Sequence, residues 1–331
     1  MPPPVTWVVT DGKAGMESQC LGLAEALGVA PTVKRISPRL PWRLLPPPLW
    51  LAPLAAPGGD GDRLASPWPD LLIATGRQTV APAAAIRRAA RGATFAVQIQ
   101  DPGVPPDRFD LVVAPAHDGL AGPNVIATLG ALHRVTRARL DAAAARLAPA
   151  VAHLPHPRVA VLVGGPNRHY RMDAAAVERL AADLARLART AGAGLLVTPS
   201  RRTGAAAEAT LRRVLEPVPS LVWDGSGENP YFGFLGLADA VVVTADSVNM
   251  ACEAAATGKP VHVVALDGGS AKFDRFHAAL RERGIARPFD GTLAAWTYPP
   301  LDETARVAAA IRARATGLNF PDPEPTTETG A

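Results

Sequence analysis

Residues 238–266 restrict the possible folds more than any other part of the chain, because they contain two short β-branched runs separated by a helix-length segment. The runs, Val241–Thr244 and Val261–Leu266, have the length of buried strands. Between them lie the potential helix cap Asp246-Ser247, a stretch of small and apolar residues, and a Gly-Lys-Pro turn that ends the helix. The segment therefore predicts a βαβ unit, which binds ligands at the carboxyl ends of its strands.

The polar residues of this unit stand where an anionic ligand would use them. Ser247 is at the expected helix start, where free N–H groups and the positive end of the helix dipole favour a phosphate. Asn249 and Glu253 are four residues apart and share one helix face. A carboxylate at this place can accept hydrogen bonds from both hydroxyls of a ribose. Alternatively, Asp246 and Ser247 only cap the helix and Glu253 is a solvated surface residue.

Strand-like and helix-like segments alternate along the rest of the chain. The other expected strands are Val5–Thr10, Val33–Ile36, Leu71–Ala74, Thr94–Ile99, Leu111–Ala114, Val159–Val163, Leu195–Thr198 and Leu221–Trp223. The pattern restarts after a proline-rich linker at residues 149–157. This alternation predicts parallel sheets with helices on both faces.

The length of 331 residues and the restart near residue 150 favour two domains. We expect a Rossmann-like N-terminal domain over residues 1–150 and a Rossmann-like C-terminal domain over residues 151–316. The last helix, Asp302–Ala315, can pack back on the first domain, and the proline-rich tail at 317–331 is expected to be disordered. The predicted fold class is thus α/β, with two Rossmann-like domains facing a cleft in which ligands bind.

In the first half, polar residues follow the ends of the expected strands. The candidate catalytic residues are Asp11, Asp101, His117 and Asp118. Asp11, in a loop with glycines after the first strand, is the leading candidate for a general base. Lys13 can neutralise a phosphate or be solvated. The alternative for each is a structural role, since a loop aspartate commonly caps a turn.

In the second half, a glycine pair and an arginine pair follow neighbouring strands. Gly164 and Gly165 allow a backbone to approach a phosphate closely, and Arg201 and Arg202 can bind diphosphate oxygens in pairs. The candidate donor-binding residues of this half are Gly164, Gly165, Asn167, Ser200, Arg201, Arg202, Asn229, Tyr231, Thr244, Asp246, Ser247, Asn249 and Glu253. Two alternatives remain open: the arginines are solvated loop residues, and residues 229–231 form an ordinary turn with a buried ring.

Composition narrows the class of protein. A net charge of +4 with a pI near 9.4 suits anionic small molecules or a membrane surface better than nucleic acid, which would need a dense basic stripe. Two distant cysteines favour a reducing compartment, and neither a metal-ligand pattern nor a required cofactor is expected.

The expected localisation is cytoplasmic, because the sequence shows neither a signal peptide nor an apolar run of about 18 residues. The segment Pro41–Pro57, with Trp42, Arg43 and Trp50, either rests on the inner face of a membrane or forms a packed irregular loop.

The segment TADSVNMACEAAATGKPV, preceded by ENPYFGFLGLADA, resembles the elongated-mitochondria type of mitochondrial fission family. Further matching segments, in the same order up to about residue 315, are DGKAG, TGRQT, QIQDP, APAHD, TLGALHRV and TPSRRT. Many bacterial members of that family are described as glycosyltransferases. The resemblance implies a glycosyltransferase-B-like fold, with a nucleotide-sugar donor in the C-terminal domain and the acceptor in the N-terminal domain. It also implies a histidine where this chain has Met16.

Three functions agree with this resemblance. The first is a glycosyltransferase that uses a nucleotide sugar as donor substrate and a cell-envelope glycan or lipid-linked molecule as acceptor. The second is a sugar-nucleotide epimerase of the same fold, and the third is a non-catalytic interaction protein of the fission type. The expected partners are therefore a nucleotide sugar and a glycan or lipid-linked acceptor, with no nucleic acid.

Overall fold

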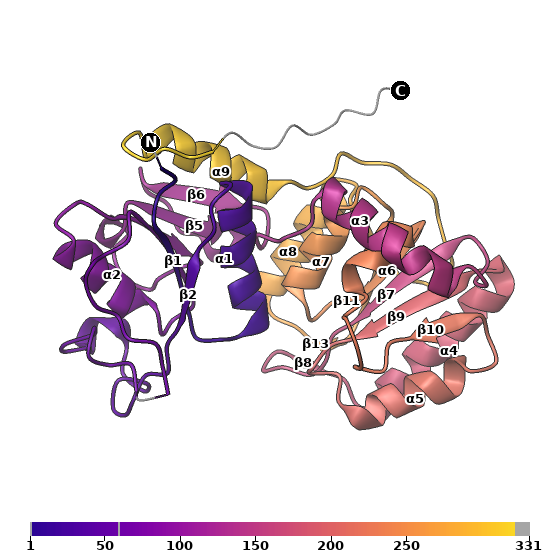
Figure 1. Cartoon of the computed structure of the whole chain (residues 1–331). Coiled ribbons are helices and arrows are strands. Elements are labelled where there is room, and N and C mark those ends of the chain that lie inside the picture. The colour runs from indigo at the N-terminus through magenta and orange to yellow at the C-terminus, as the bar shows by residue number, and fades with distance from the viewer. Residues whose placement is uncertain (1, 59, 322–331) are drawn as a thin grey trace. The chain divides into compact units, whose positions relative to one another are not determined.

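The computed structural model describes residues 2–58 and 60–321, which form two compact units (Figure 1). The first unit contains the chain up to Arg134 and the chain from Asp302 onward, and the second contains Val135–Leu301. The border thus precedes the expected one at residue 150, because helix α3 (Arg137–Leu147) packs on helix α6 (Tyr231–Leu237) of the second unit. Gly236 permits this packing, since a Cβ there would lie 2.6 Å from the carbonyl oxygen of Leu140.

The sheet of the first unit is parallel, in the order β2-β1-β3-β4-β5-β6. Its strands are β1 (Thr6–Thr10), β2 (Thr32–Arg35), β3 (Leu71–Thr75), β4 (Phe95–Ile99), β5 (Leu111–Pro115) and β6 (Val125–Thr128). The strand β6 has no counterpart among the expected strands. Its four residues alternate between buried and more exposed positions, a short signal at the edge of a sheet.

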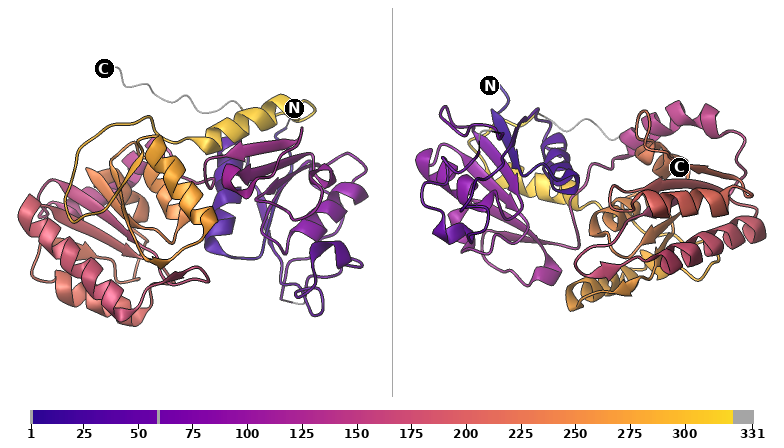
Figure 2. Two further views of the ribbon diagram at one scale, coloured as in Figure 1. Left: turned by 180° about the vertical axis from the view of Figure 1, so that it is seen from behind. Right: turned by 90° about the horizontal axis from the view of Figure 1, so that it is seen from below.

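Both faces of this sheet are covered by helices (Figure 2). Alternate strand residues such as Val8 and Ile73 pack against α1 (Ala14–Ala26) and α9 (Glu303–Arg314). The intervening residues, such as Val9 and Leu72, pack against α2 (Val80–Ala89). Burial on both faces explains why these strands read as continuous apolar runs rather than as alternating ones.

Residues beyond the last helix also pack on the first unit. Leu318 and Phe320 contact the core under α1 and α9, and Arg312 stacks over the ring of Phe320 at 5.4 Å. The tail expected to be disordered from residue 317 is therefore ordered as far as residue 321. The rest of that expected tail, residues 322–331, lies outside the described residues.

The second unit contains a parallel sheet in the order β10-β9-β7-β11-β12-β14 and a small antiparallel ribbon, β13-β8. Its strands are β7 (Arg158–Val163), β8 (Tyr170–Arg171), β9 (Gly194–Pro199), β10 (Ser220–Val222), β11 (Ala240–Thr244), β12 (Val261–Val264), β13 (Asp267–Gly268) and β14 (Ala286–Pro288). Its remaining helices are α4 (Ala174–Ala191), α5 (Ala205–Leu215), α7 (Val248–Ala255) and α8 (Ala271–Glu282). Helices α4 and α5 pack on the face that carries Val161 and Val197, and α6 contacts β7 and β9. The two helix-covered parallel sheets confirm the predicted α/β class.

Candidate functional site

Three loops of the second unit meet at one edge of its sheet. Residues Gly164-Gly165 follow β7, Ser200–Thr203 follow β9, and Ala245–Ser247 follow β11. Strand β7 pairs with β9 on one side and with β11 on the other, so the three parallel strands bring their carboxyl ends together. In open α/β sheets ligands bind outside this edge.

The carboxylate of Asp246, whose side chain is fully buried, links these loops. It accepts hydrogen bonds from the Gly165 N–H at 3.0 Å, from the Arg202 guanidinium at 2.7 Å and from the Thr244 hydroxyl at 2.7 Å. Arg202 also donates to the carbonyl oxygen of Gly165 at 3.0 Å. Because the carboxylate is buried and paired with a guanidinium, these hydrogen bonds fix the relative positions of the three loops.

Glycine is needed at residues 164 and 165 because two neighbouring loops pack closely against their backbone. A Cβ on Gly164 would lie 2.2 Å from both carboxylate oxygens of Asp246, and one on Gly165 would lie 2.2 Å from the carbonyl oxygen of Arg202. The N–H groups of the two glycines donate to Thr244 and to Asp246. The space beside these glycines and their two N–H groups, which were expected to serve a phosphate, are thus occupied by the end of β11 and by the loops that follow β9 and β11.

The two arginines of the β9 loop are in different situations. Arg202 is held by Asp246, and its N–H donates to the Ser200 hydroxyl at 3.2 Å. Arg201 is exposed and makes no hydrogen bond or ion pair with residues 2–58 or 60–321. Thr203, which is buried, holds the loop because its hydroxyl accepts from the Ser200 N–H and lies 3.0 Å from the carbonyl oxygen of Val163. Arg201 is therefore the arginine available for an anion.

Ser247 caps α7, since its hydroxyl accepts the N–H of Met250 at 3.3 Å. Beside the cap, the Asn167 amide donates to the carbonyl oxygen of Asp246 at 3.3 Å. The amide oxygen of Asn167 accepts the N–H groups of His169 and Tyr170, which orders the loop after β7. The capping role and a phosphate role are compatible, because one side chain satisfies only one of the free N–H groups at a helix start.

Glu253 lies on α7, half-buried, and accepts a hydrogen bond from the hydroxyl of Tyr231 at 2.6 Å. Burial raises the pKa of Glu253 to about 7, although the hydrogen bond from Tyr231 acts in the opposite direction. Tyr231 begins α6, and its N–H donates to the side chain of Asn229 at 3.0 Å. Asn249, also half-buried, lies one turn before Glu253 on the same helix.

His277 is a residue of this region that the sequence did not point to. Its Nε2 lies 2.9 Å from the carbonyl oxygen of Ala245, in the loop between β11 and α7. Burial lowers the pKa of His277, although the hydrogen bond to Ala245 acts in the opposite direction. The two residues are 32 positions apart and meet only because α8 packs on this loop, which no local pattern reveals.

The first unit has its own set of polar residues at strand ends. Asp11, whose side chain is 6% exposed, pairs with the ammonium group of Lys13 at 2.5 Å. Asp101 accepts the N–H of Gly103 at 2.8 Å and so closes a turn. The side chains of His117 and Asp118, which follow β5, are both nearly buried. The Nε2 of His117 lies 3.8 Å from the Oδ1 of Asp118. The turn-capping alternative thus describes the geometry of Asp101 and also that of Asp11, which accepts the backbone N–H of Lys13 at 3.4 Å in addition to its ion pair.

Met16 is a further residue at this edge. Its sulfur accepts hydrogen bonds from the Gln100 amide at 3.2 Å and from the Thr75 hydroxyl at 3.7 Å. Gln100 has a positive φ of 72°, which is uncommon for a residue with a side chain. The position where the resemblance implies histidine therefore lies between the ends of β3 and β4.

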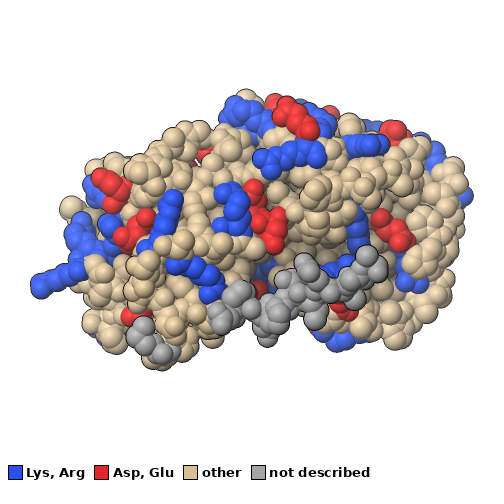
Figure 3. All heavy atoms as spheres, turned by 90° about the horizontal axis from the view of Figure 1, so that it is seen from above, with Lys and Arg blue, Asp and Glu red and all other residues tan. Residues whose placement is uncertain are grey.

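Within the described chain, no group of three His, Cys, Asp or Glu side chains could hold a metal ion. Among the same residues, no helix has the length and apolar character needed to cross a membrane. On the face shown in Figure 3, Lys and Arg side chains are interspersed with Asp and Glu. That face therefore carries neither a continuous positive patch nor a continuous negative one.

The model of the mitochondrial fission ELM1 family matches residues 14–315. The chain belongs to this family. It is 37% identical over 271 residues to the mitochondrial fission protein ELM1 of Arabidopsis thaliana, in a match that covers 74% of this chain. The chain spans 63% of the length of that plant relative. It is also 27% identical over 286 residues to the uncharacterized protein RP120 of Rickettsia prowazekii, covering 74% of this chain and 79% of the other.

Solved structures place this ELM1-family chain in the glycosyltransferase-B-like fold. The UDP-GlcNAc 2-epimerase of Methanocaldococcus jannaschii matches with a TM-score of 0.52 and 12% identity, over 96% of this chain and 95% of the other. The glycosyltransferase SnogD of Streptomyces nogalater matches with a TM-score of 0.50 and 14% identity, over 96% of both chains. The family and fold implied by the sequence are thereby confirmed.

Proposed function

We propose that this ELM1-family chain binds a nucleoside-diphosphate sugar at the carboxyl ends of β7, β9 and β11 and transfers its glycosyl group to an acceptor. The observation that carries the proposal is the Asp246 network, because it holds the start of α7 and the arginine loop at one edge. Such an arrangement presents helix N–H groups and a guanidinium to a diphosphate. The likeness to a glycosyltransferase and an epimerase of nucleotide sugars supports the same ligand class.

In this proposal, Arg201 and the N–H groups at the start of α7 bind the diphosphate, and Glu253 accepts the ribose hydroxyls. Asn249 lies beside Glu253, and Tyr231 with Asn229 borders the nucleoside. No metal or organic cofactor is required, because the guanidinium and the helix dipole stabilise the charge that develops on the leaving diphosphate.

The acceptor is proposed to lie at the first unit, where Asp11 removes the proton of its hydroxyl group. The acceptor oxygen then bonds to the anomeric carbon, the bond to the diphosphate breaks, and the nucleoside diphosphate leaves with the electron pair. Asp101, His117 and Asp118 are the other candidate bases, and Lys13 neutralises charge near Asp11. A cell-envelope glycan or lipid-linked acceptor would place the reaction at the cytoplasmic face of a membrane.

A panel of UDP-, GDP-, ADP- and CMP-sugars in a thermal-shift assay tests the proposal and identifies the base. Incubation of the bound nucleotide sugar with and without acceptor then distinguishes the reactions. Release of nucleotide that requires an acceptor supports transfer, whereas formation of an isomeric sugar nucleotide without acceptor supports epimerisation. The name of the family favours a third candidate, a non-catalytic fission-type protein, and the absence of binding to every nucleotide sugar would favour that candidate.

Arg201→Ala is expected to weaken nucleotide-sugar binding by about fivefold, since an exposed ion pair is worth at most about 1 kcal/mol. The loss should shrink as salt is added, because salt screens exposed charges. Calorimetric titration at two salt concentrations measures both effects. The matched variant is Arg213→Ala, an exposed arginine on α5 that pairs with Glu178. Equal effects of the two substitutions would contradict the assignment of Arg201.

The stability of the second unit is expected to fall as pH rises from about 4.5 to about 7, through Glu253. The folded state keeps a proton on this carboxyl in that range, because its pKa is about 7 in place of 4.5, whereas the unfolded state has lost it. Urea unfolding at both ends of the range, for the natural chain and for Glu253→Gln, measures the effect. The variant should lose this part of the pH dependence, and an unchanged pH dependence would contradict the raised pKa.

A further inference from the structure

Most of the strongly exposed large hydrophobic side chains in the described part of the chain gather in one loop of the first unit. Leu40, Leu44, Leu49 and Leu51 are between 56% and 83% exposed. Val5, at 60%, is the remaining one and lies at the start of β1. We call residues 38–57 the leucine loop. In Figure 1 it lies below β2 and beside α2. Single exposed leucines are ordinary, but a cluster of four indicates an interaction surface.

The leucine loop is closed at its base by backbone contacts. Pro38 and Pro57 form an antiparallel bridge, and the N–H of Arg39 donates to the carbonyl oxygen of Ala56 at 3.0 Å. The N–H of Gly58 donates to the carbonyl oxygen of Ser37 at 2.7 Å. The loop is therefore a separate structural element attached after the carboxyl end of β2.

Two indoles fix the interior of the leucine loop. Trp50 is buried and donates to the carbonyl oxygen of Leu45 at 3.1 Å. Trp42 donates to the carbonyl oxygen of Leu51 at 2.9 Å. Since the larger aromatic groups hold the backbone, the leucines point outward as part of an ordered structure. Their exposure is a property of the fold.

The apolar surface continues beside the loop. A depression of about 380 Å³ is lined by residues of the loop and of α2, including Ala52, Leu54 and Ala85. Arg88 supplies the charged group of its lining. Apolar side chains next to a guanidinium form a surface that suits an amphiphile.

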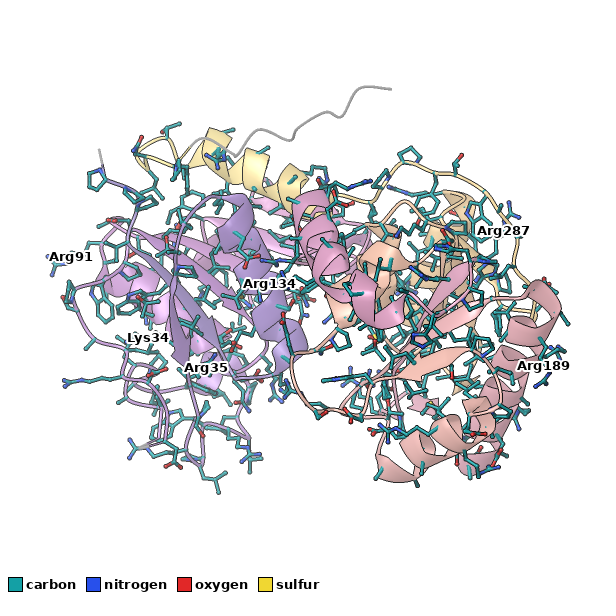
Figure 4. The ribbon with its side chains drawn as sticks, turned by 45° about the vertical axis from the view of Figure 1, so that its right-hand side comes forward. Lys34, Arg35, Arg91, Arg134, Arg189 and Arg287 are labelled. Atoms are coloured by element: carbon teal, nitrogen blue, oxygen red, sulfur yellow. The ribbon has the colours of Figure 1, made fainter. Side chains whose placement is uncertain are left out.

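All charged residues in the sequence around the leucine loop, from residue 26 to residue 59, are positive. No Asp or Glu occurs between Glu25 and Asp60, whereas Lys34, Arg35, Arg39 and Arg43 do. Figure 4 shows Lys34 and Arg35 on the first unit, where β2 leads into the loop. Arg77, which follows β3, donates to the loop at the carbonyl oxygens of Leu44 and Leu45, at 3.5 and 3.4 Å. Arg35 is paired with Glu17. Arg39, Arg43 and Arg77 form no ion pair within residues 2–58 and 60–321, so these three arginines complement an anionic partner.

We propose that the leucine loop docks into the surface of a lipid bilayer that contains anionic phospholipid. The leucines enter the outer hydrocarbon region, and the arginines bind headgroup phosphates. Leucines exposed by as much as 83% protrude from the protein. A fluid hydrocarbon phase can surround each protruding leucine, whereas a rigid protein partner would need a separate pocket for each one. The exposure of these leucines therefore favours a bilayer over a protein partner.

Docking also orients the first unit. The leucine loop follows β2, and Asp11 and Arg77 follow the parallel strands β1 and β3 at the same edge of the sheet. A docked loop therefore brings this edge toward the headgroups, where a lipid-linked acceptor would present its hydroxyl. This consequence rests on the proposed function, whereas the docking itself does not.

Sedimentation of the full chain with phosphatidylcholine vesicles, with and without phosphatidylglycerol, tests the docking. The natural chain should bind the anionic vesicles more tightly and lose affinity as salt is added. The double variant Leu44→Glu/Leu51→Glu should bind about tenfold more weakly or worse, since each glutamate opposes insertion. Val5→Glu is the matched control, because it changes an equally exposed apolar residue at the opposite edge of the same sheet. Arg43→Glu should weaken binding to anionic vesicles only.

Absence of vesicle binding by the natural chain would overturn the proposal, as would equal binding by the double variant. Light scattering without lipid measures whether the chain self-associates through the loop. If the natural chain self-associates and the double variant is monomeric while neither binds vesicles, the loop is an interface between copies and the proposal is wrong. Nucleotide-sugar binding by the double variant should stay unchanged, so that failure of docking and failure of the proposed function are told apart.

Discussion

Asp246→Ala is expected to lower the free energy of unfolding of the second unit by about 2–6 kcal/mol, because two buried donors lose their acceptor at a cost of about 1–3 kcal/mol each, whereas the half-exposed Arg202 can be solvated. The substitution leaves the N–H of Gly165 and the hydroxyl of Thr244 without their acceptor in a buried place. It also releases Arg202, so the loops after β7, β9 and β11 lose their common link. Urea unfolding measures the loss, and hydrogen exchange of the three strands assigns it to this unit.

The matched control is Asp267→Ala, which removes an exposed carboxylate of β13 in the same unit. Its effect should stay within about 0.5 kcal/mol, as is usual for surface substitutions. If Asp246→Ala cost less than about 1 kcal/mol, the carboxylate would not be the link between the loops. Nucleotide-sugar binding should fall together with loop order, since Asp246 acts by positioning the loops.

Glu253→Ala is expected to weaken nucleotide-sugar binding by about 1.5–3 kcal/mol, the usual worth of a hydrogen bond to a charged group. This corresponds to a loss of affinity of about tenfold or more. The physical reason is that the carboxylate on α7 accepts the ribose hydroxyls in the proposed complex. Titration calorimetry at about pH 8, where a carboxyl with a pKa of about 7 is ionised, provides the measurement with the nucleotide sugar identified by the thermal-shift panel.

Two further variants serve as controls for the Glu253→Ala result. Tyr231→Phe removes only the hydroxyl that donates to Glu253 at 2.6 Å, so it should cost less affinity than Glu253→Ala. Glu216→Ala removes an exposed carboxylate at the end of α5 and should leave binding unchanged. Undiminished binding by a folded Glu253→Ala protein would mean that this carboxylate does not contact the ribose.

Much of the fold follows from local sequence patterns. Continuous β-branched and apolar runs such as Val159–Val163 predict strands that are buried on both faces, and the structure contains β7 there. The expected cap at Ser247 is also present, because capping needs only a side chain and an N–H three residues away. Strand β6 and the ribbon of β8 and β13 were not predicted, since two to four residues give too weak a periodic signal.

The sequence by itself determined the α/β class, the two halves and the strand ends where polar residues gather. Tertiary structure alone decided the partners of those residues: Asp246 with Arg202, Tyr231 with Glu253, and His277 with the carbonyl oxygen of Ala245. Tertiary structure also assigned α3 to the second unit, although the linker after it suggested the first. The physical reason is that secondary structure depends on residues within a few positions. Which of two neighbouring arginines reaches a buried carboxylate depends on how separate loops pack.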